Sequence, residues 1–169
     1  PSPARCARRG ATPRAAADCA QKNSFVERGY CISSPDAPSN SGFSYDPRFD
    51  RLIDTYAQNA NIDPYLVRCL IKVESDYNPN AVSVAGAAGL MQLMQETAWQ
   101  YGCTNRADPE SNIRVGVSHL AYLLKRFYGD VSLALAAYHA GGTRVSKNMS
   151  VPQIRSTIGY VNLIMYYYT

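Results

Sequence analysis

The chain has 169 residues, of which 46% are hydrophobic and 18% are charged. This composition is typical of a globular protein and excludes a chain that is disordered throughout, and the length suits one ordinary domain, or a smaller domain with a tail. A run of about 18 apolar residues, which a membrane-spanning helix needs, is absent from the sequence. The first residues also lack a charged start followed by an apolar core, so we expect that any export signal has been removed.

The first 42 residues are rich in proline, alanine and serine and show no sustained hydrophobic period. We predict that they form a poorly regular N-terminal extension of unknown role, followed by a domain at residues 43–169. Part of the net charge of +4 lies here, on basic residues within the first 28 positions. A solvated tail, an attraction to an anionic wall polymer and nucleic-acid binding all fit such a cluster. Because interleaved aromatic residues are lacking, we expect no nucleic-acid partner.

From Asp46 onward, apolar residues recur at helical spacing, and polar or glycine-containing turns separate the periodic stretches. Asp63, Asp108 and Asp130 stand before three of these stretches, where their side chains can cap a helix. No convincing hairpin or alternating strand occurs, so we predict an all-α fold. The expected helices cover residues 46–61, 64–75, 95–101, 109–128 and 131–138, with a last one from about 152 or 157 to 167.

Glu74 is the one acid of the predicted helix 64–75 and falls in its last turn. The negative end of the helix dipole and any apolar neighbours would both favour the protonated carboxyl and raise its pKa. A carboxyl with a raised pKa is suited to general-acid catalysis near neutral pH. The other interpretation is a solvated glutamate at a helix end, so the residues that follow decide between the two.

A glycine-rich segment, AVSVAGAAGLMQLM, follows at residues 81–94. Gly86 and Gly89 make this segment too flexible for a regular helix and would let its backbone approach a ligand closely. Ser83 and Gln92 offer polar groups suited to hold a carboxyl or a sugar acetamido group. The segment therefore indicates a binding loop beside the placed acid.

The order of motifs around Glu74 resembles the catalytic module of the lytic transglycosylases, which is similar to goose-type lysozyme. The resemblance covers about residues 48 to 165 and implies a lysozyme-like helical domain. The matching positions are Glu74-Ser75, Pro79, Ala81, Ser83, Gly86, Gly89-Leu90-Met91-Gln92, Met94, Thr97-Ala98, Asp108-Pro109, Asn112-Ile113, Gly116, Ala137-Tyr138-His139-Ala140-Gly141 and Tyr160-Val161.

By this resemblance, we expect cleavage of the β-1,4 bond between N-acetylmuramic acid and N-acetylglucosamine with Glu74 as the single catalytic residue. Its proton would go to the leaving oxygen, and its carboxylate would then take the proton of the muramyl C6 hydroxyl, which attacks C1 and gives a 1,6-anhydro product. Neither a metal nor another cofactor is expected. The sequence fits a single acid, because Asp76 would point to another side of the helix and Asp108 and Glu110 serve a helix start.

The resemblance also implies substrate contacts by motif position. Tyr138 is expected to hydrogen-bond the catalytic carboxyl, and Met91 and Met94 are expected to line the sugar cleft. Taken alone, a methionine pair more often belongs to the core than to a cleft. The chain departs from the family pattern at His139, where asparagine is usual, at Ser156, where an acid is usual, and at Gln95, where proline is usual. The expected substrate-binding residues are Ser83, Met91, Gln92, Met94, Tyr138, His139 and Tyr160.

Other functions stay open at this point. A lysozyme-type muramidase would hydrolyse the same bond with water as the attacking group, which a fold does not decide. A non-catalytic peptidoglycan-binding module would not need Glu74, so its retention argues against that interpretation. We expect peptidoglycan glycan strands as the partner and, from size and resemblance, a cell-envelope secretion, conjugation or pilus machine as the candidate setting.

Five cysteines are many for a reducing compartment, and their spacing contains no C-x-x-C pattern of a zinc site. We therefore expect a periplasmic or otherwise exported protein. A disulfide between Cys69 and Cys103 is predicted, with a buried free thiol as the open alternative for Cys69. One further bridge is expected among Cys6, Cys19 and Cys31.

Overall fold

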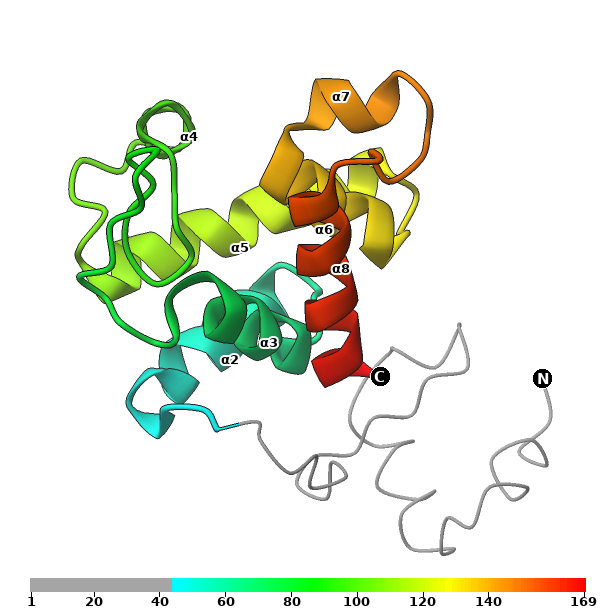
Figure 1. Cartoon of the computed structure of the whole chain (residues 1–169). Coiled ribbons are helices and arrows are strands. Elements are labelled where there is room, and N and C mark those ends of the chain that lie inside the picture. Colours follow the sequence, from blue (N-terminus) through cyan, green and yellow to red (C-terminus); the bar gives the residue numbers. More distant parts are fainter. Residues whose placement is uncertain (1–43) are drawn as a thin grey trace, which may run out of the picture. The chain divides into compact units, whose positions relative to one another are not determined.

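The structure, a computed structural model, describes residues 44–169, which fold into helices joined by turns and a glycine-rich loop (Figure 1). Two isolated bridges, Val82 with Ala88 and Ala88 with Leu93, are the only β pairing in this part, so the predicted all-α class is confirmed. The predicted extension at 1–42 and its three cysteines lie outside the described residues, and its boundary stays a prediction. The elements are η3 (Pro47–Phe49), α2 (Asp50–Asn59), α3 (Pro64–Ser75), α4 (Gln95–Gln100), α5 (Pro109–Arg126), α6 (Val131–Ala140), α7 (Gly142–Ser146) and α8 (Arg155–Tyr168).

Three aspartates start helices as the sequence predicts. Asp63 Oδ1 accepts the backbone N–H of Tyr65 at 2.8 Å ahead of α3, and Asp108 and Asp130 accept backbone N–H groups in the first turns of α5 and α6. Proline follows the cap in α3 and α5, where its missing N–H costs no intrahelical bond. The capped start of α3 places Glu74 in its last turn.

α6 packs against α5, α7 and α8 (Figure 1). Residues 134–137 of α6 are all buried, because this helix is apolar around its whole circumference. α3 packs against α2 on one side and α8 on another, so the helix that carries Glu74 is held by elements from both ends of the described chain. Each fully buried Leu or Ile in these contacts contributes roughly 1.5–3 kcal/mol.

A second, smaller apolar cluster consists of Leu93, Ala98, Cys103 and Val115. Cys69 belongs to the main core cluster instead. Because the two cysteines are buried in separate clusters and both are free thiols, the predicted Cys69–Cys103 disulfide is wrong. The alternative, a buried thiol on the apolar face of α3, is confirmed for Cys69.

The glycine-rich loop is tied to α5 by one fully buried amide, Asn112. Its Nδ2 donates to the carbonyl of Ala88 at 3.0 Å and of Arg106 at 2.7 Å, and its Oδ1 accepts the N–H of Met91 at 2.8 Å. Gly89 has a φ of +82°, and a Cβ there would lie 2.1 Å from Asn112 Nδ2. Glycine is therefore needed for close approach, but to a side chain of the protein and not to a ligand.

The α6–α7 junction differs from the prediction. The helix expected over residues 131–138 continues to Ala140, and the short helix α7 begins at Gly142. Gly141, with a φ of +90°, makes the turn between them.

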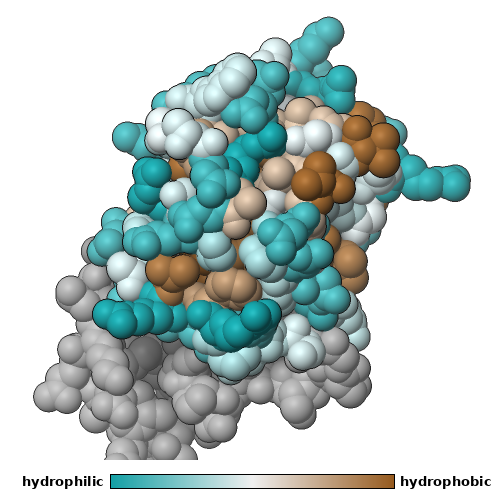
Figure 2. All heavy atoms as spheres, turned by 90° about the vertical axis from the view of Figure 1, so that its left-hand side faces the viewer, coloured by the Kyte–Doolittle hydropathy of each residue, from teal (hydrophilic) through white to brown (hydrophobic). Residues whose placement is uncertain are grey.

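Figure 2 shows the side of the molecule on which α4 lies, where hydrophobic surface forms small separate patches among hydrophilic residues. Four exposed apolar side chains come from α4 and the loop before it: Val82, Val84, Met94 and Trp99. No helix within residues 44–169 combines the length and the hydropathy needed to cross a membrane.

Candidate active site

Glu74 is half-buried in the last turn of α3, and its Oε1 accepts a hydrogen bond from the hydroxyl of Tyr160 at 2.5 Å. The two residues are 86 positions apart, and the packing of α3 on α8 brings them together. Burial raises the pKa of Glu74 to about 7, and the Tyr160 hydroxyl acts in the opposite direction with a smaller effect. The predicted rise in pKa is confirmed, so Glu74 can hold a proton near neutral pH.

Two buried tyrosine hydroxyls belong to this site. Burial, together with the nearby charge of Glu74, raises the pKa of Tyr138 and of Tyr160 well above the usual range, so both stay protonated and can donate. Tyr138 donates to the carbonyl of Met91 at 2.8 Å. The hydrogen bond to the carboxyl that was expected from Tyr138 is therefore made by Tyr160 instead.

The backbone of Leu90 and Met91 is held by side chains from three helices. Ser75 Oγ of α3 donates to the Leu90 carbonyl at 2.7 Å, Tyr138 of α6 donates to the Met91 carbonyl, and Asn112 of α5 accepts the Met91 N–H. Ser75 directly follows Glu74 in α3. The loop is thereby fixed relative to the carboxyl.

Ser83 and Gln92, two predicted binding residues, form hydrogen bonds within the loop. Ser83 Oγ accepts the backbone N–H of Ala87 at 3.0 Å. Gln92 Nε2 donates to the carbonyls of Ala81 at 3.0 Å and of Gly89 at 2.9 Å. Both N–H groups of the Gln92 amide are thus engaged, which leaves its oxygen for a ligand.

The two methionines of the loop differ in exposure. Met91 is fully buried and lies so close to Gly116 that a Cβ at residue 116 would stand 2.3 Å from its Sδ. The prediction that Met91 lines a sugar cleft is therefore wrong, because its side chain fills the core. Met94, at the start of α4, is 41% exposed and can contact a ligand.

His139 extends the site beyond Tyr160. The rings of the two residues lie 4.6 Å apart, and His139 Nδ1 lies 3.2 Å from Oγ1 of the buried Thr157. Burial lowers the pKa of His139, so the imidazole is neutral near pH 7. The structure thus brings Glu74, Tyr138, His139 and Tyr160 together.

Sequence reasoning missed a buried imidazole next to these residues. His119 of α5 lies 5.5 Å from the ring of Tyr138, 6.0 Å from Tyr101 and 6.3 Å from Tyr122. Its Nδ1 is buried without a hydrogen-bond partner among the described residues, and burial lowers the pKa of the ring. The anchoring roles of Ser75 and Asn112 were missed as well; for Asn112, an amide within the apolar pattern of a predicted helix was the available signal.

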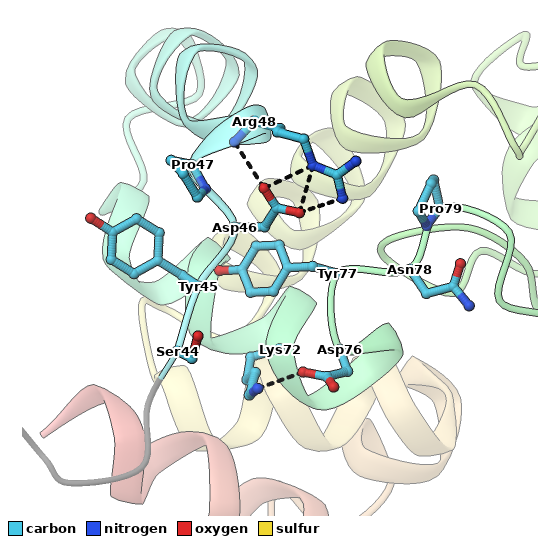
Figure 3. Close-up of a pocket in the computed structure, with 10 residues that line it drawn as sticks. All are labelled: Ser44, Tyr45, Asp46, Pro47, Arg48, Lys72, Asp76, Tyr77, Asn78 and Pro79. Atoms are coloured by element: carbon cyan, nitrogen blue, oxygen red, sulfur yellow. Dashed lines mark hydrogen bonds and ion pairs between the residues drawn. The ribbon is translucent and has the colours of Figure 1, made fainter.

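A cavity of about 580 Å³ lies between residues 44–48 and 72–79 (Figure 3). Its charged side chains form two ion pairs, Arg48 with Asp46 and Lys72 with Asp76, each at 2.5 Å. Glu74 does not line this cavity, and Asp76 is engaged with Lys72, so Asp76 is not a second acid of the site. Within residues 44–169, no group of three His, Cys, Asp or Glu residues is arranged to hold a metal ion.

The family model of the transglycosylase SLT domain matches residues 51–159. Among curated relatives, "Transglycosylase" of Enterobacteria phage PRD1 is 51% identical over 81 residues, which cover 48% of this chain and 30% of the relative. "Membrane-bound lytic murein transglycosylase F" of Pseudoalteromonas translucida (strain TAC 125) is 39% identical over 106 residues, which cover 59% of this chain and 22% of the relative. The chain thus spans less than a third of the length of these relatives.

Solved structures agree with this match. The 70 kDa soluble lytic transglycosylase of Escherichia coli is similar over 70% of this chain and 23% of its own, with 27% identity and a TM-score of 0.63. An inactive mutant of the lytic transglycosylase Slt of Pseudomonas aeruginosa is similar over 69% of this chain and 22% of its own, with 27% identity and a TM-score of 0.62. The expected lysozyme-like helical fold is confirmed, and the matched residues include most of the site. The chain belongs to the transglycosylase SLT domain family.

Proposed function

We propose that this chain is a peptidoglycan lytic transglycosylase that cleaves the β-1,4 bond between N-acetylmuramic acid and N-acetylglucosamine. The observation that carries the proposal is a single half-buried glutamate, Glu74, whose pKa is about 7 and whose carboxyl is held by Tyr160 within the family's domain. The names of the relatives, which include lytic murein transglycosylases, support the same activity.

In the first step, protonated Glu74 gives its proton to the glycosidic oxygen, and the bond from that oxygen to muramyl C1 breaks. In the second step, the Glu74 carboxylate takes the proton of the muramyl C6 hydroxyl, whose oxygen bonds to C1. The product is a 1,6-anhydro sugar, and Glu74 ends protonated as it began. A pKa near 7 suits both roles, because neither form of the carboxyl is costly at neutral pH.

The other groups of the site hold the reacting sugar and the loop. We infer that Met94 and His139 contact the sugar and that Tyr160 orients the carboxyl. The Ser83 hydroxyl donates to the sugar's acetamido group, and the Gln92 oxygen accepts from it. Tyr138 acts through the Met91 carbonyl, since its hydroxyl is engaged there. The exposed apolar side chains of α4 and the loop before it, Val82, Val84, Met94 and Trp99, suit the apolar faces of a glycan strand.

The setting follows from the substrate. Peptidoglycan lies outside the cytoplasmic membrane, so we infer a periplasmic or otherwise exported protein. A phage transglycosylase among the relatives supports a role in opening the wall for a larger machine, such as a secretion, conjugation or pilus apparatus.

The test is mass spectrometry of the soluble products released from purified peptidoglycan. The wild-type protein should release anhydromuramyl products, which are one water lighter than hydrolysed ones, and Glu74→Gln should release none. Glu96→Gln, which changes an acid of the first turn of α4, is the matched control and should behave as wild type. Reducing-end products would instead identify a muramidase, and no release by the wild type would refute both activities.

A further inference from the structure

A second cavity, of about 370 Å³, lies where α6 turns into α7. It is lined by Ala140, Gly141, Gly142, Thr143, Arg144 and Lys147. Arg144 and Lys147 are its only charged residues, both are exposed, and within residues 44–169 neither forms an ion pair. This arrangement is the reverse of the cavity in Figure 3, where every cation has its own aspartate.

The region around this cavity is basic. Residues 122–169 contain five cations and one acid, whereas residues 44–121 contain six cations and nine acids. Arg126 of α5 does not line the cavity but lies near it, because its guanidinium donates to Ser146 Oγ at 2.9 Å and lies 3.7 Å from the position of a Cβ on Gly142. The one acid, Asp130, caps α6. The uncompensated positive charge therefore attracts an anion to this corner of the domain.

The cavity begins one residue after His139. The His139 ring lies against Tyr160, and Tyr160 hydrogen-bonds Glu74. α6, which carries His139, packs against both α7 and α8, and α8 carries Tyr160. The cavity thus follows directly, along α6, the histidine that packs on the hydrogen-bond partner of Glu74.

We propose that this cavity binds the carboxylates of the peptide stem of peptidoglycan, an inference that rests on the proposed function. The stem branches from the lactyl group of the muramyl sugar, which is the sugar attacked at C1, and it carries several carboxylates. Arg144 and Lys147 supply charge-assisted hydrogen bonds to such groups, and the volume suits a short peptide segment. The side-chain-free Gly141 and Gly142 leave room for its backbone.

The lining favours a peptide over other anionic polymers. No aromatic side chain lines the cavity, so it lacks the platform on which nucleic-acid bases stack. Its walls also present no large apolar side chain for insertion between lipids. A carboxylate held by the side chains of Arg144 and Lys147 needs neither.

The test compares Arg144→Gln/Lys147→Gln with wild type on glycan strands that carry stems and on strands stripped of stems by an amidase. On stem-bearing strands, the double variant should raise KM roughly five- to tenfold with kcat little changed; on stripped strands, the two proteins should be equal. Arg51→Gln, which removes an exposed cation of α2, should behave as wild type on both. Equal KM values for the double variant and the wild type on stem-bearing strands would overturn the inference, as would equal losses on both substrates.

Binding separates this inference from the proposed activity. In the inactive Glu74→Gln background, co-sedimentation with stem-bearing sacculi should weaken when Arg144→Gln/Lys147→Gln is added, whereas binding to stripped sacculi should not change. If the wild type cleaves neither substrate but this difference in binding remains, peptide binding by the cavity is supported and the proposed cleavage activity is refuted. If the added substitutions weaken only binding to anionic phosphatidylglycerol vesicles, the cavity takes a lipid headgroup and the inference is wrong.

Discussion

A carboxyl whose pKa is about 7 changes its charge within the ordinary assay range, so Glu74 should set a limb of the pH profile. Because the first step needs the protonated acid, we expect kcat/KM to fall as the pH rises through about 7. Tyr160→Phe removes the hydrogen bond that lowers this pKa, so the fall should move to higher pH in that variant. Pre-steady or steady-state kinetics across pH 5 to 9 would measure both. Tyr128→Phe, at an exposed tyrosine, is the control, and an unmoved limb in Tyr160→Phe would assign the limb to another group.

The same titration affects stability. The folded pKa of Glu74 is raised from 4.5 to about 7, so the folded state binds the proton more tightly than the unfolded state does. The free energy of unfolding should therefore decrease as the pH rises from about 4.5 to about 7. Glu74→Gln lacks this loss and should be more stable than wild type at pH 8, by about 3 kcal/mol at most, and nearly equal at pH 4. Urea denaturation at the two pH values would show it, and a difference that does not depend on pH would contradict this account.

Nδ1 of His119 has no hydrogen-bond partner within residues 44–169 and should cost stability, because a buried polar atom that makes no hydrogen bond has lost its bonds to water without replacement. His119→Phe keeps an aromatic ring against Tyr101 and Tyr138 and removes that atom. We expect the melting temperature to rise by a few degrees, which corresponds to about 1 kcal/mol. Calorimetry would measure the change, and a lower melting temperature would mean that the imidazole has a partner in solution.

At the scale of elements, the close contact of α5 with the loop depends on one glycine. Gly116→Ala would place Cβ 2.3 Å from Met91 Sδ and 2.8 Å from Met91 Cβ, in a core without room to yield. We expect a loss of about 1–3 kcal/mol of stability and a fall in activity, since the displaced Met91 backbone is fixed beside Glu74. Gly159→Ala on α8 is the matched control: nothing lies within 4 Å of its Cβ position, so it should stabilise the helix by about 0.5–1 kcal/mol. Equal effects of the two substitutions would refute the packing argument.

Helix starts could be predicted from the sequence where the capping residue lies close to the group that it caps. The side chain of Asp63 caps a backbone group only two residues away, so the start of α3 and the last-turn position of Glu74 follow from a short stretch of sequence. The choice between Tyr138 and Tyr160 as the partner of Glu74 depends on how α6 and α8 cross, which neither helix encodes alone. Similarly, Gly89 signalled a close approach of backbone, but only the packed structure shows that the neighbour is Asn112.

At the scale of the whole molecule, cysteine number proved a poor guide to pairing. Abundant cysteines indicate an oxidising compartment but give no distance, and Cys69 and Cys103 lie in separate clusters. Burial raises the pKa of Cys69 to about 12, so its thiolate is scarce at neutral pH. We expect iodoacetamide to leave Cys69 unlabelled in the folded protein and to label it after unfolding. Peptide mass spectrometry would show this, and a Cys69–Cys103 bridged peptide in a non-reducing digest would contradict it.

The hydrogen bond between Glu74 and Tyr160 joins residues 86 positions apart. Because contacts between distant residues form late in folding, the site is completed late. During synthesis, Glu74 emerges long before α8 does. A partly emerged chain therefore carries the acid without the hydroxyl that orients it and without the helix that shields it from water. Its carboxyl then titrates as an ordinary exposed glutamate and is ionised at neutral pH. The order of residues along the chain therefore keeps Glu74 ionised and without its hydrogen-bond partner until α8 has docked on α3.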